Sequence, residues 1–189
     1  DLEHTALLGD TLEQIAREKI DAAPEGATLF APSDIAVRET VAAYGASRRL
    51  NVQFVSYDSA PAPPLAGAHQ RSNAALAVAL ARTIVPLNDD QVGQALAAIR
   101  WPGRLEVLGD DPLIVIDVGH TPAGVAASLQ AFETMRGARN AVLVCGASAD
   151  KDAGALIGAL AMVPYDLVLM DVHMPVLDDA LQVQIAHQQ

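Results

Sequence analysis

The spacing of apolar and polar residues predicts two regions with different rhythms. In the first region, short apolar strands alternate with helices that begin at polar capping residues. The clearest start is at Asp10 or Thr11, which have Glu13 or Gln14 three residues on, as a capping box requires. This helix is expected to end near Lys19. Further helices are expected at 33–45, 70–84 and 89–99, with Ser33 and Asn88 as caps, and strands at 27–31 and 51–57.

The pattern is interrupted at Trp101-Pro102-Gly103-Arg104, which is the candidate linker. Beyond it, strands are expected at 113–118, 141–145 and 167–172, and helices at 121–137 and 152–162. The stretch at 113–118 is apolar at every position except Asp117, and such a run is typical of a buried strand. Strands separated by helices at this spacing favour a parallel sheet with right-handed crossovers. We therefore predict an α/β fold with domains at 1–103 and 104–189.

The net charge and composition of the chain exclude some classes of binding partner. The 189 residues carry a formal net charge of −11, which repels nucleic acid and anionic membranes, so we expect neither as a partner. An anionic ligand would need local help from a metal ion, arginines or helix N-termini. Cys145 is the only cysteine and no apolar run approaches membrane-spanning length, so a cytoplasmic setting is the default expectation.

Five segments of the chain carry motifs that can be compared with known families. They are Asp1-Leu2-Glu3-His4 with the helix to Lys19, Gly67-Ala68-His69-Gln70-Arg71-Ser72-Asn73-Ala74-Ala75, Trp101-Pro102-Gly103-Arg104-Leu105-Glu106, Ile116-Asp117-Val118-Gly119-His120-Thr121-Pro122 and Gly146-Ala147-Ser148-Ala149-Asp150-Lys151-Asp152. In this order they resemble the folylpolyglutamate and dihydrofolate synthases of the Mur ligase superfamily. The resemblance covers roughly residues 1–160.

The resemblance implies a fold, a reaction and a setting. Residues 1–103 would be the remainder of a Mur-ligase-type central ATPase domain, and 104–189 a Rossmann-like C-terminal α/β domain with a mostly parallel sheet. The implied enzyme is a cytoplasmic monomer of folate metabolism that uses ATP and Mg²⁺. It would convert a folate or pteroate carboxylate into an acyl phosphate, which the amine of glutamate then attacks.

One motif that this reaction needs does not occur in the 189 residues. The phosphate-binding sequence Gly-x-x-x-x-Gly-Lys-Ser/Thr is absent, so the chain alone is expected to be inactive as a ligase. A chain that opens with Asp1 rather than methionine is interpreted as part of something longer. Two departures from the family pattern weaken the substrate assignment more than the fold: Gly119 and Thr121 in the fourth segment, and Ile20-Asp21-Ala22 after Lys19.

The resemblance also implies a metal site. His4 and a carbamylated Lys19 would bind Mg²⁺, since a carbamate offers the oxygen ligands that this hard ion prefers. The metal would offset the charge of the transferred phosphoryl group, which gives Lys19 a catalytic role. The alternative from the residues alone is a surface histidine and a solvated cation at a helix C-terminus.

Four further residues are candidates by the same resemblance. Asn73 would bind the adenine edge, or else act as a capping or turn residue. Arg104 would reach the ATP phosphates, or else be a solvated linker residue. Asp117 would bind the ribose or orient the nucleotide, and His120 would assist proton transfer near the acyl phosphate. Alternatively, Asp117 and Thr121 cap the next helix and His120 is a packed polar residue.

Two other interpretations remain open. Lys151, between two aspartates, is interpreted as a glutamate-binding residue or as part of a solvated loop. A second segment resembles the phosphoacceptor strand of receiver domains, with Asp171 as acceptor, although no acidic pair ends the preceding strand. It is Tyr165-Asp166-Leu167-Val168-Leu169-Met170-Asp171-Val172-His173-Met174-Pro175. The rival functions are therefore a non-catalytic nucleotide- or partner-binding module and a receiver-like phosphoacceptor.

Overall fold

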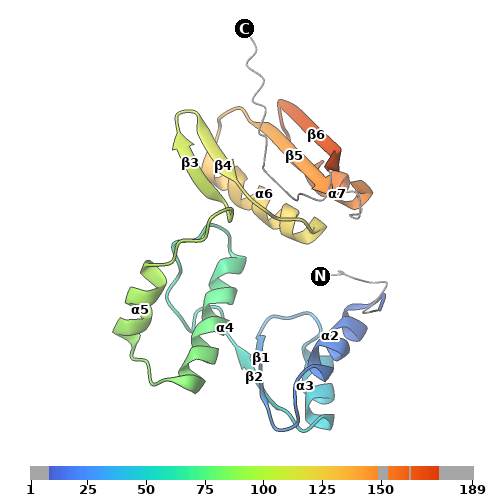
Figure 1. Ribbon diagram of the computed structural model, residues 1–189, viewed down its shortest axis with the longest axis vertical. Coiled ribbons are helices and arrows are strands. Elements are labelled where there is room, and N and C mark those ends of the chain that lie inside the picture. Colours follow the sequence, from blue (N-terminus) through green and yellow to red (C-terminus); the bar gives the residue numbers. More distant parts are fainter. Residues whose placement is uncertain (1–8, 149–152, 162, 175–189) are drawn as a thin grey trace. The chain divides into compact units, whose positions relative to one another are not determined.

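The computed structural model describes residues 9–148, 153–161 and 163–174. The chain divides into two compact units, Asp1–Val118 and Gly119–Gln189. Figure 1 shows helices and strands in both units, which confirms the α/β fold class. No helix in the described ranges combines the length and the apolar character that crossing a bilayer requires.

The first unit begins with two helices beside a pair of parallel strands. Strands β1 (Thr28–Pro32) and β2 (Asn51–Val55) pair in parallel, and helices α2 (Leu12–Asp21) and α3 (Arg38–Ser47) pack with them (Figure 1). Gly45 lets α3 approach β2 closely, because a Cβ at this position would collide with Val52. The buried residues of this cluster are Ile20, Ala31, Val37, Val41 and Leu50.

In the first unit, two of the three predicted helix caps are confirmed. Thr11 and Asn88 each form a capping box with the glutamine three residues on. The expected cap at Ser33 is wrong, because α3 begins at Arg38 and its N-cap, Val37, has no side-chain cap. The backbone N–H of Ser33 instead donates to the Val55 carbonyl and extends the strand pairing. Residues 33–37 then form turns before the helix.

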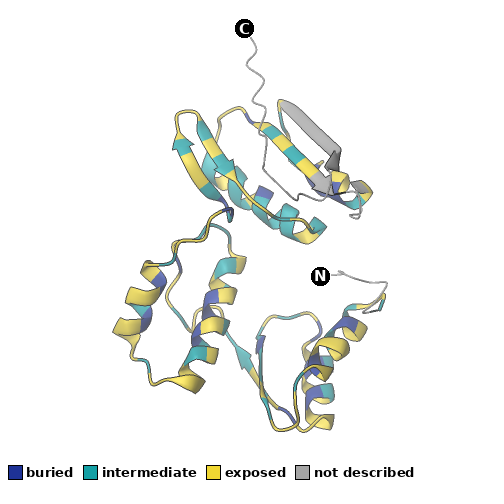
Figure 2. Ribbon diagram, viewed as in Figure 1, coloured by how far each residue is buried: buried dark blue, intermediate teal, exposed yellow. Residues whose placement is uncertain are grey.

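Two further helices form a separate core in the first unit. Helix α4 (His69–Ile84) packs on α5 (Asp89–Ala97) through Ala74, Val78, Val92 and Leu96. These buried residues appear as dark blue segments on the two ribbons in Figure 2. The loop predicted from the prolines between 58 and 67 is confirmed.

The strand expected at 113–118 pairs differently from the prediction. Strand β4 (Leu113–Ile116) forms an antiparallel hairpin with β3 (Glu106–Asp110), which the sequence analysis missed. The expected burial is also wrong, because alternate side chains of β4 are exposed, including Ile114 at 41% and Ile116 at 39%. A continuous apolar run fits a buried parallel strand, but Asp110-Asp111-Pro112 supplies a turn that lets β3 pair with it.

The second unit keeps the predicted order of helices and strands. Helix α6 (Pro122–Arg136) starts at Thr121, whose hydroxyl accepts from the Gly124 N–H at 3.0 Å, and it ends before Gly137. Strands β5 (Val142–Ser148) and β6 (Leu167–Met174) pair in parallel, and α7 (Ala153–Leu160) lies between them in the sequence. The expected parallel pairing of these two strands is confirmed.

Candidate functional site

The β3–β4 hairpin brings two of the sequence motifs together. Glu106 is in register with Ile116, so the turn before β3 lies beside the end of β4. The Leu105 N–H donates to the Asp117 carboxylate at 3.0 Å. The Val118 N–H donates to the Gly103 carbonyl at 2.9 Å. Arg104 and Asp117, predicted from separate motifs, therefore belong to one local structure.

The turn that carries Arg104 has an unusual backbone. Gly103 and Leu105 both have positive φ angles, +70° and +48°, and Leu105 is buried. Left-handed geometry is costly for a residue with a side chain, so surrounding contacts must hold it in place. Gly103 also lies close to Val118, where an added Cβ would come within 2.9 Å of a Val118 methyl. This position therefore favours glycine both for its φ angle and for its space.

The guanidinium of Arg104 differs from the other arginines of the chain. It is half-buried and makes no hydrogen bond or ion pair with any residue that the structure describes. The other arginines contact aromatic rings, carboxylates or backbone carbonyls of the described residues. They are Arg17, Arg38, Arg48, Arg49, Arg71, Arg82, Arg100, Arg136 and Arg139. In a chain of net charge −11, Arg104 is thus a cation that remains available to an anionic ligand.

Asn73 lies in α4, in the same unit. It is exposed, and its amide donates to the Gln70 side-chain oxygen at 3.2 Å, while the Gln70 amide lies 3.1 Å from the His69 ring. Asn73 is the fifth residue of the helix, whose N-cap position is Ala68. The alternative interpretation of Asn73 as the helix cap is therefore wrong, and no contact among the described residues joins it to the Arg104 turn.

The predicted metal ligands are only partly described. Lys19 is exposed in the last turn of α2, where a cation is favourable next to the helix C-terminus. His4 and Lys151 lie outside the described residues, as do the side chains of β6, including Asp171. No group of three or more His, Cys, Asp or Glu side chains suited to a metal occurs in the described part of the chain.

His120 lies at the start of the second unit. It is exposed, so the alternative interpretation of His120 as a packed polar residue is wrong. The interpretation of Thr121, the next residue, as the cap of α6 is confirmed. The structure thus brings together Arg104 and Asp117. Lys19 and Asn73 come from other elements of the first unit, and His120 from the second.

A C-terminal segment of the chain matches a known family. Residues 103–186 match the family described as the Mur ligase, glutamate ligase domain. This part of the chain is a Mur ligase C-terminal domain. By sequence the domain includes the β3–β4 hairpin, whereas the compact units divide after Val118. The domain boundary predicted at 103–104 stays a prediction.

Several proteins similar to the chain are named folylpolyglutamate synthases. A probable bifunctional folylpolyglutamate synthase/dihydropteroate synthase of Halobacterium salinarum is 35% identical over 187 residues, covering 84% of this chain and 22% of the relative. A folylpolyglutamate synthase of Lacticaseibacillus casei is 36% identical over 102 residues, covering 51% of this chain and 24% of the relative. The chain thus spans about a quarter or less of the length of these relatives.

Solved structures show the same relationship. A structure of Mycobacterium tuberculosis folylpolyglutamate synthase complexed with ADP and AMPPCP aligns with a TM-score of 0.75 at 26% identity. It covers 90% of this chain, which spans 45% of that structure. These matches confirm the resemblance to the folylpolyglutamate and dihydrofolate synthases.

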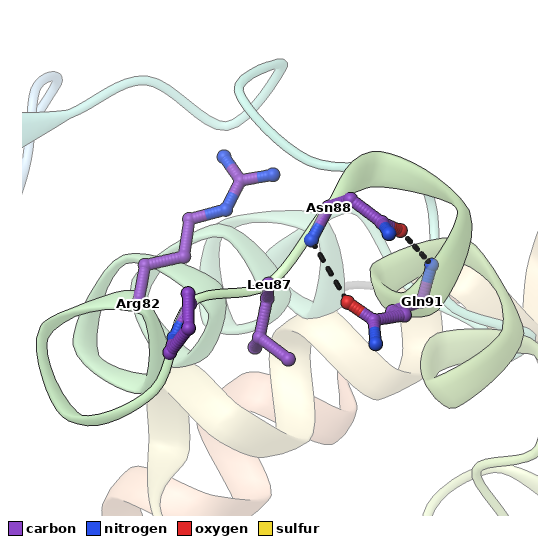
Figure 3. Close-up of a pocket in the computed structure, with 5 residues that line it drawn as sticks. Arg82, Leu87, Asn88 and Gln91 are labelled. Carbon is purple, nitrogen blue, oxygen red and sulfur yellow. Dashed lines mark hydrogen bonds between the residues drawn. The ribbon is translucent and has the colours of Figure 1, made fainter.

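Two surface hollows of the chain are lined by residues other than the predicted site residues. One, of about 490 Å³, lies between α4 and α5 and is lined by Arg82, Pro86, Leu87, Asn88 and Gln91. Figure 3 shows that Asn88 and Gln91 bond to each other's backbone in the capping box. The second, of about 400 Å³, lies between α2 and α3 beside Tyr44. Because the polar groups of the first hollow serve helix capping, we assign it no ligand.

Glu106 was not predicted from the sequence as a functional residue, although it ends the third motif. The Gly103 N–H donates to the Glu106 carboxylate at 2.8 Å, across the same turn that carries Arg104. A glutamate two residues after an arginine is a weak signal by itself. A glycine three residues before a carboxylate is a stronger one, because that spacing lets a side chain close a turn.

Proposed function

We propose that this chain is part of an ATP-dependent ligase that joins glutamate to a folate or pteroate carboxylate through an acyl phosphate. We further propose that it is inactive alone, because the phosphate-binding loop lies outside it. The observation that carries the proposal is the half-buried Arg104, without a partner among the described residues, in a turn shared with Asp117.

Names and ligands of related proteins support this proposal. The similar proteins are named folylpolyglutamate synthases, and one solved relative is described as a complex with AMPPCP and folate. That structure aligns with a TM-score of 0.75 and 25% identity over 90% of this chain. AMPPCP is an analogue of ATP, so the relative holds a folate and a stand-in for ATP, which correspond to two of the three substrates of the proposed reaction.

Each candidate residue has a role in the proposal. Arg104 binds phosphate oxygens, for which a guanidinium offers paired donors. Asp117 orients the ribose while one of its oxygens also holds Leu105. Asn73 reads the adenine edge, and His120 assists proton transfer from the incoming amine.

The metal ligands of the proposal are His4 and Lys19. Lys19 would bind Mg²⁺ as a carbamate, and the metal would supply charge neutralisation at the phosphate groups. The described residues alone do not form a metal site, so the ligand set depends on His4 and on the ligand itself.

The direct test uses the longest protein that carries this chain. Its sequence should contain the Gly-x-x-x-x-Gly-Lys-Ser/Thr motif, and it should release phosphate from ATP when given glutamate and a folate or pteroate. Arg104→Ala should abolish most of this activity, whereas Arg49→Ala, in an exposed ion pair with Glu25, should leave it unchanged. Nucleotide binding without turnover would instead favour the non-catalytic module.

A further inference from the structure

The backbone of the Arg104 turn is held on both sides by carboxylates. The Gly103 N–H donates to Glu106 at 2.8 Å, and the Leu105 N–H donates to Asp117 at 3.0 Å. Between them, the Arg104 N–H donates to the Trp101 carbonyl at 3.3 Å. Three successive backbone donors are therefore already engaged inside the protein.

This arrangement decides which group can meet an anion. A run of free backbone N–H groups often cradles a phosphate, but here those donors are occupied. The Arg104 side chain is the remaining donor of the turn, and it has no partner among the described residues. Anion recognition at this turn therefore depends on the direction in which the guanidinium leaves the backbone.

We propose that Glu106 is a positioning residue, which sets the direction of Arg104 by fixing the Gly103 N–H, with Asp117 fixing the Leu105 N–H on the other side. The functional part of this inference rests on the proposed nucleotide-binding function. Glu106 begins β3 and is held in register with Ile116, so its backbone is anchored to the hairpin from which its carboxylate reaches Gly103. The positive φ angle of Leu105 requires such support, because this backbone geometry is strained for a residue with a side chain.

Nucleotide affinity tests the coupling between Glu106 and Arg104. The 189-residue chain has a single tryptophan, Trp101, which is 62% exposed and three residues from Arg104, so its fluorescence reports ligand binding. With ADP and Mg²⁺ as the probe, we expect Glu106→Ala to weaken binding by about tenfold, as the loss of one charge-assisted contact does. Glu106→Gln keeps an oxygen acceptor and should therefore lose less affinity for ADP than Glu106→Ala.

The double variant separates positioning from a general structural effect. If Glu106 acts through Arg104, then Glu106→Ala should cause no further loss of affinity in an Arg104→Ala background. Equal losses in both backgrounds would overturn the proposal. Unfolding curves of each variant control for loss of the fold.

A second measurement needs no ligand. We expect Glu106→Ala to speed hydrogen exchange at the Gly103 amide, and Asp117→Ala to speed it at the Leu105 amide. Unchanged exchange at Gly103 would overturn the positioning role even if nucleotide binds. If the unaltered chain binds no nucleotide but Gly103 exchange responds to Glu106→Ala, then the proposed function fails for this chain while the role of Glu106 in fixing the turn stands.

Discussion

Asp117 and Leu105 are joined by a hydrogen bond of 3.0 Å between a carboxylate oxygen and a backbone N–H. The bond ties the end of β4 to the turn before β3, so a change in either motif is transmitted to the other. Leu105 is buried and has a positive φ angle, which makes this contact part of what holds the turn in shape. The predictions for the turn follow from this link.

Replacing Gly103 by alanine should destabilise the chain by about 1–2 kcal/mol, because an L-residue resists a φ of +70°. The added methyl would also crowd Val118. Denaturant unfolding of the variant measures the effect as a lower midpoint at unchanged slope.

The matched control is Gly93→Ala in α5. Gly93 has ordinary helical geometry and open space around it, so alanine should stabilise the helix by about 0.5–1 kcal/mol. Opposite signs for the two glycines are the expected result. A stabilising effect at both positions would show that the turn is not held as described.

Salt dependence should reveal whether Arg104 meets a charged ligand. At low ionic strength, Arg104→Ala should weaken ADP binding by about tenfold. The difference in ADP affinity between the variant and the unaltered chain should become smaller as salt is added, because salt screens the charge interaction. Titrations followed by Trp101 fluorescence at several salt concentrations measure this. Arg49→Ala, which removes an exposed ion pair, should leave the affinity unchanged. A salt-independent difference would argue against a phosphate contact.

Local signals predicted most of the helix starts correctly. The capping boxes at Thr11 and Asn88 involve residues only three apart, so the sequence contains all the required information. Serine is also favoured at helix caps, but Ser33 does not cap a helix, because its backbone N–H pairs with β2. The pairing with β2 therefore outweighs the local preference of serine for the N-cap position.

The candidate site could be predicted only in part, because it too depends on a pairing between strands that the sequence did not predict. The motifs indicated Arg104 and Asp117 separately, but the apolar run at 113–118 was interpreted as a buried parallel strand. Its antiparallel pairing with β3 depends on a partner that no local pattern marks clearly. That pairing creates the Asp117–Leu105 contact and places Glu106 in the turn, so neither could be inferred before the hairpin was known.

Asn88 caps a helix and Ser33 does not, and the stabilities of two alanine variants can test this difference. Asn88→Ala should cost about 1 kcal/mol of unfolding free energy, because it removes the acceptor of the Gln91 N–H at 2.9 Å. Ser33→Ala should cost less, since α3 begins five residues later without a side-chain cap. Thermal or denaturant unfolding distinguishes the two, and equal losses would contradict the assigned helix start.

Alkaline pH should destabilise the chain through Tyr44. Its hydroxyl donates to the Asp21 carboxylate at 3.1 Å, and this bond, followed by desolvation and the charge of Asp21, raises the pKa of Tyr44 above its ordinary value of 10.0. Folding therefore favours the protonated phenol. The stabilisation is fully present below pH 10 and is lost as the pH rises through the raised pKa. Tyr44→Phe removes this group, so its stability should fall less steeply above pH 10 than that of the unaltered chain. Because Tyr165 is present in both proteins, its titration cancels in the comparison, and parallel stability profiles above pH 10 would rule out the Tyr44–Asp21 linkage.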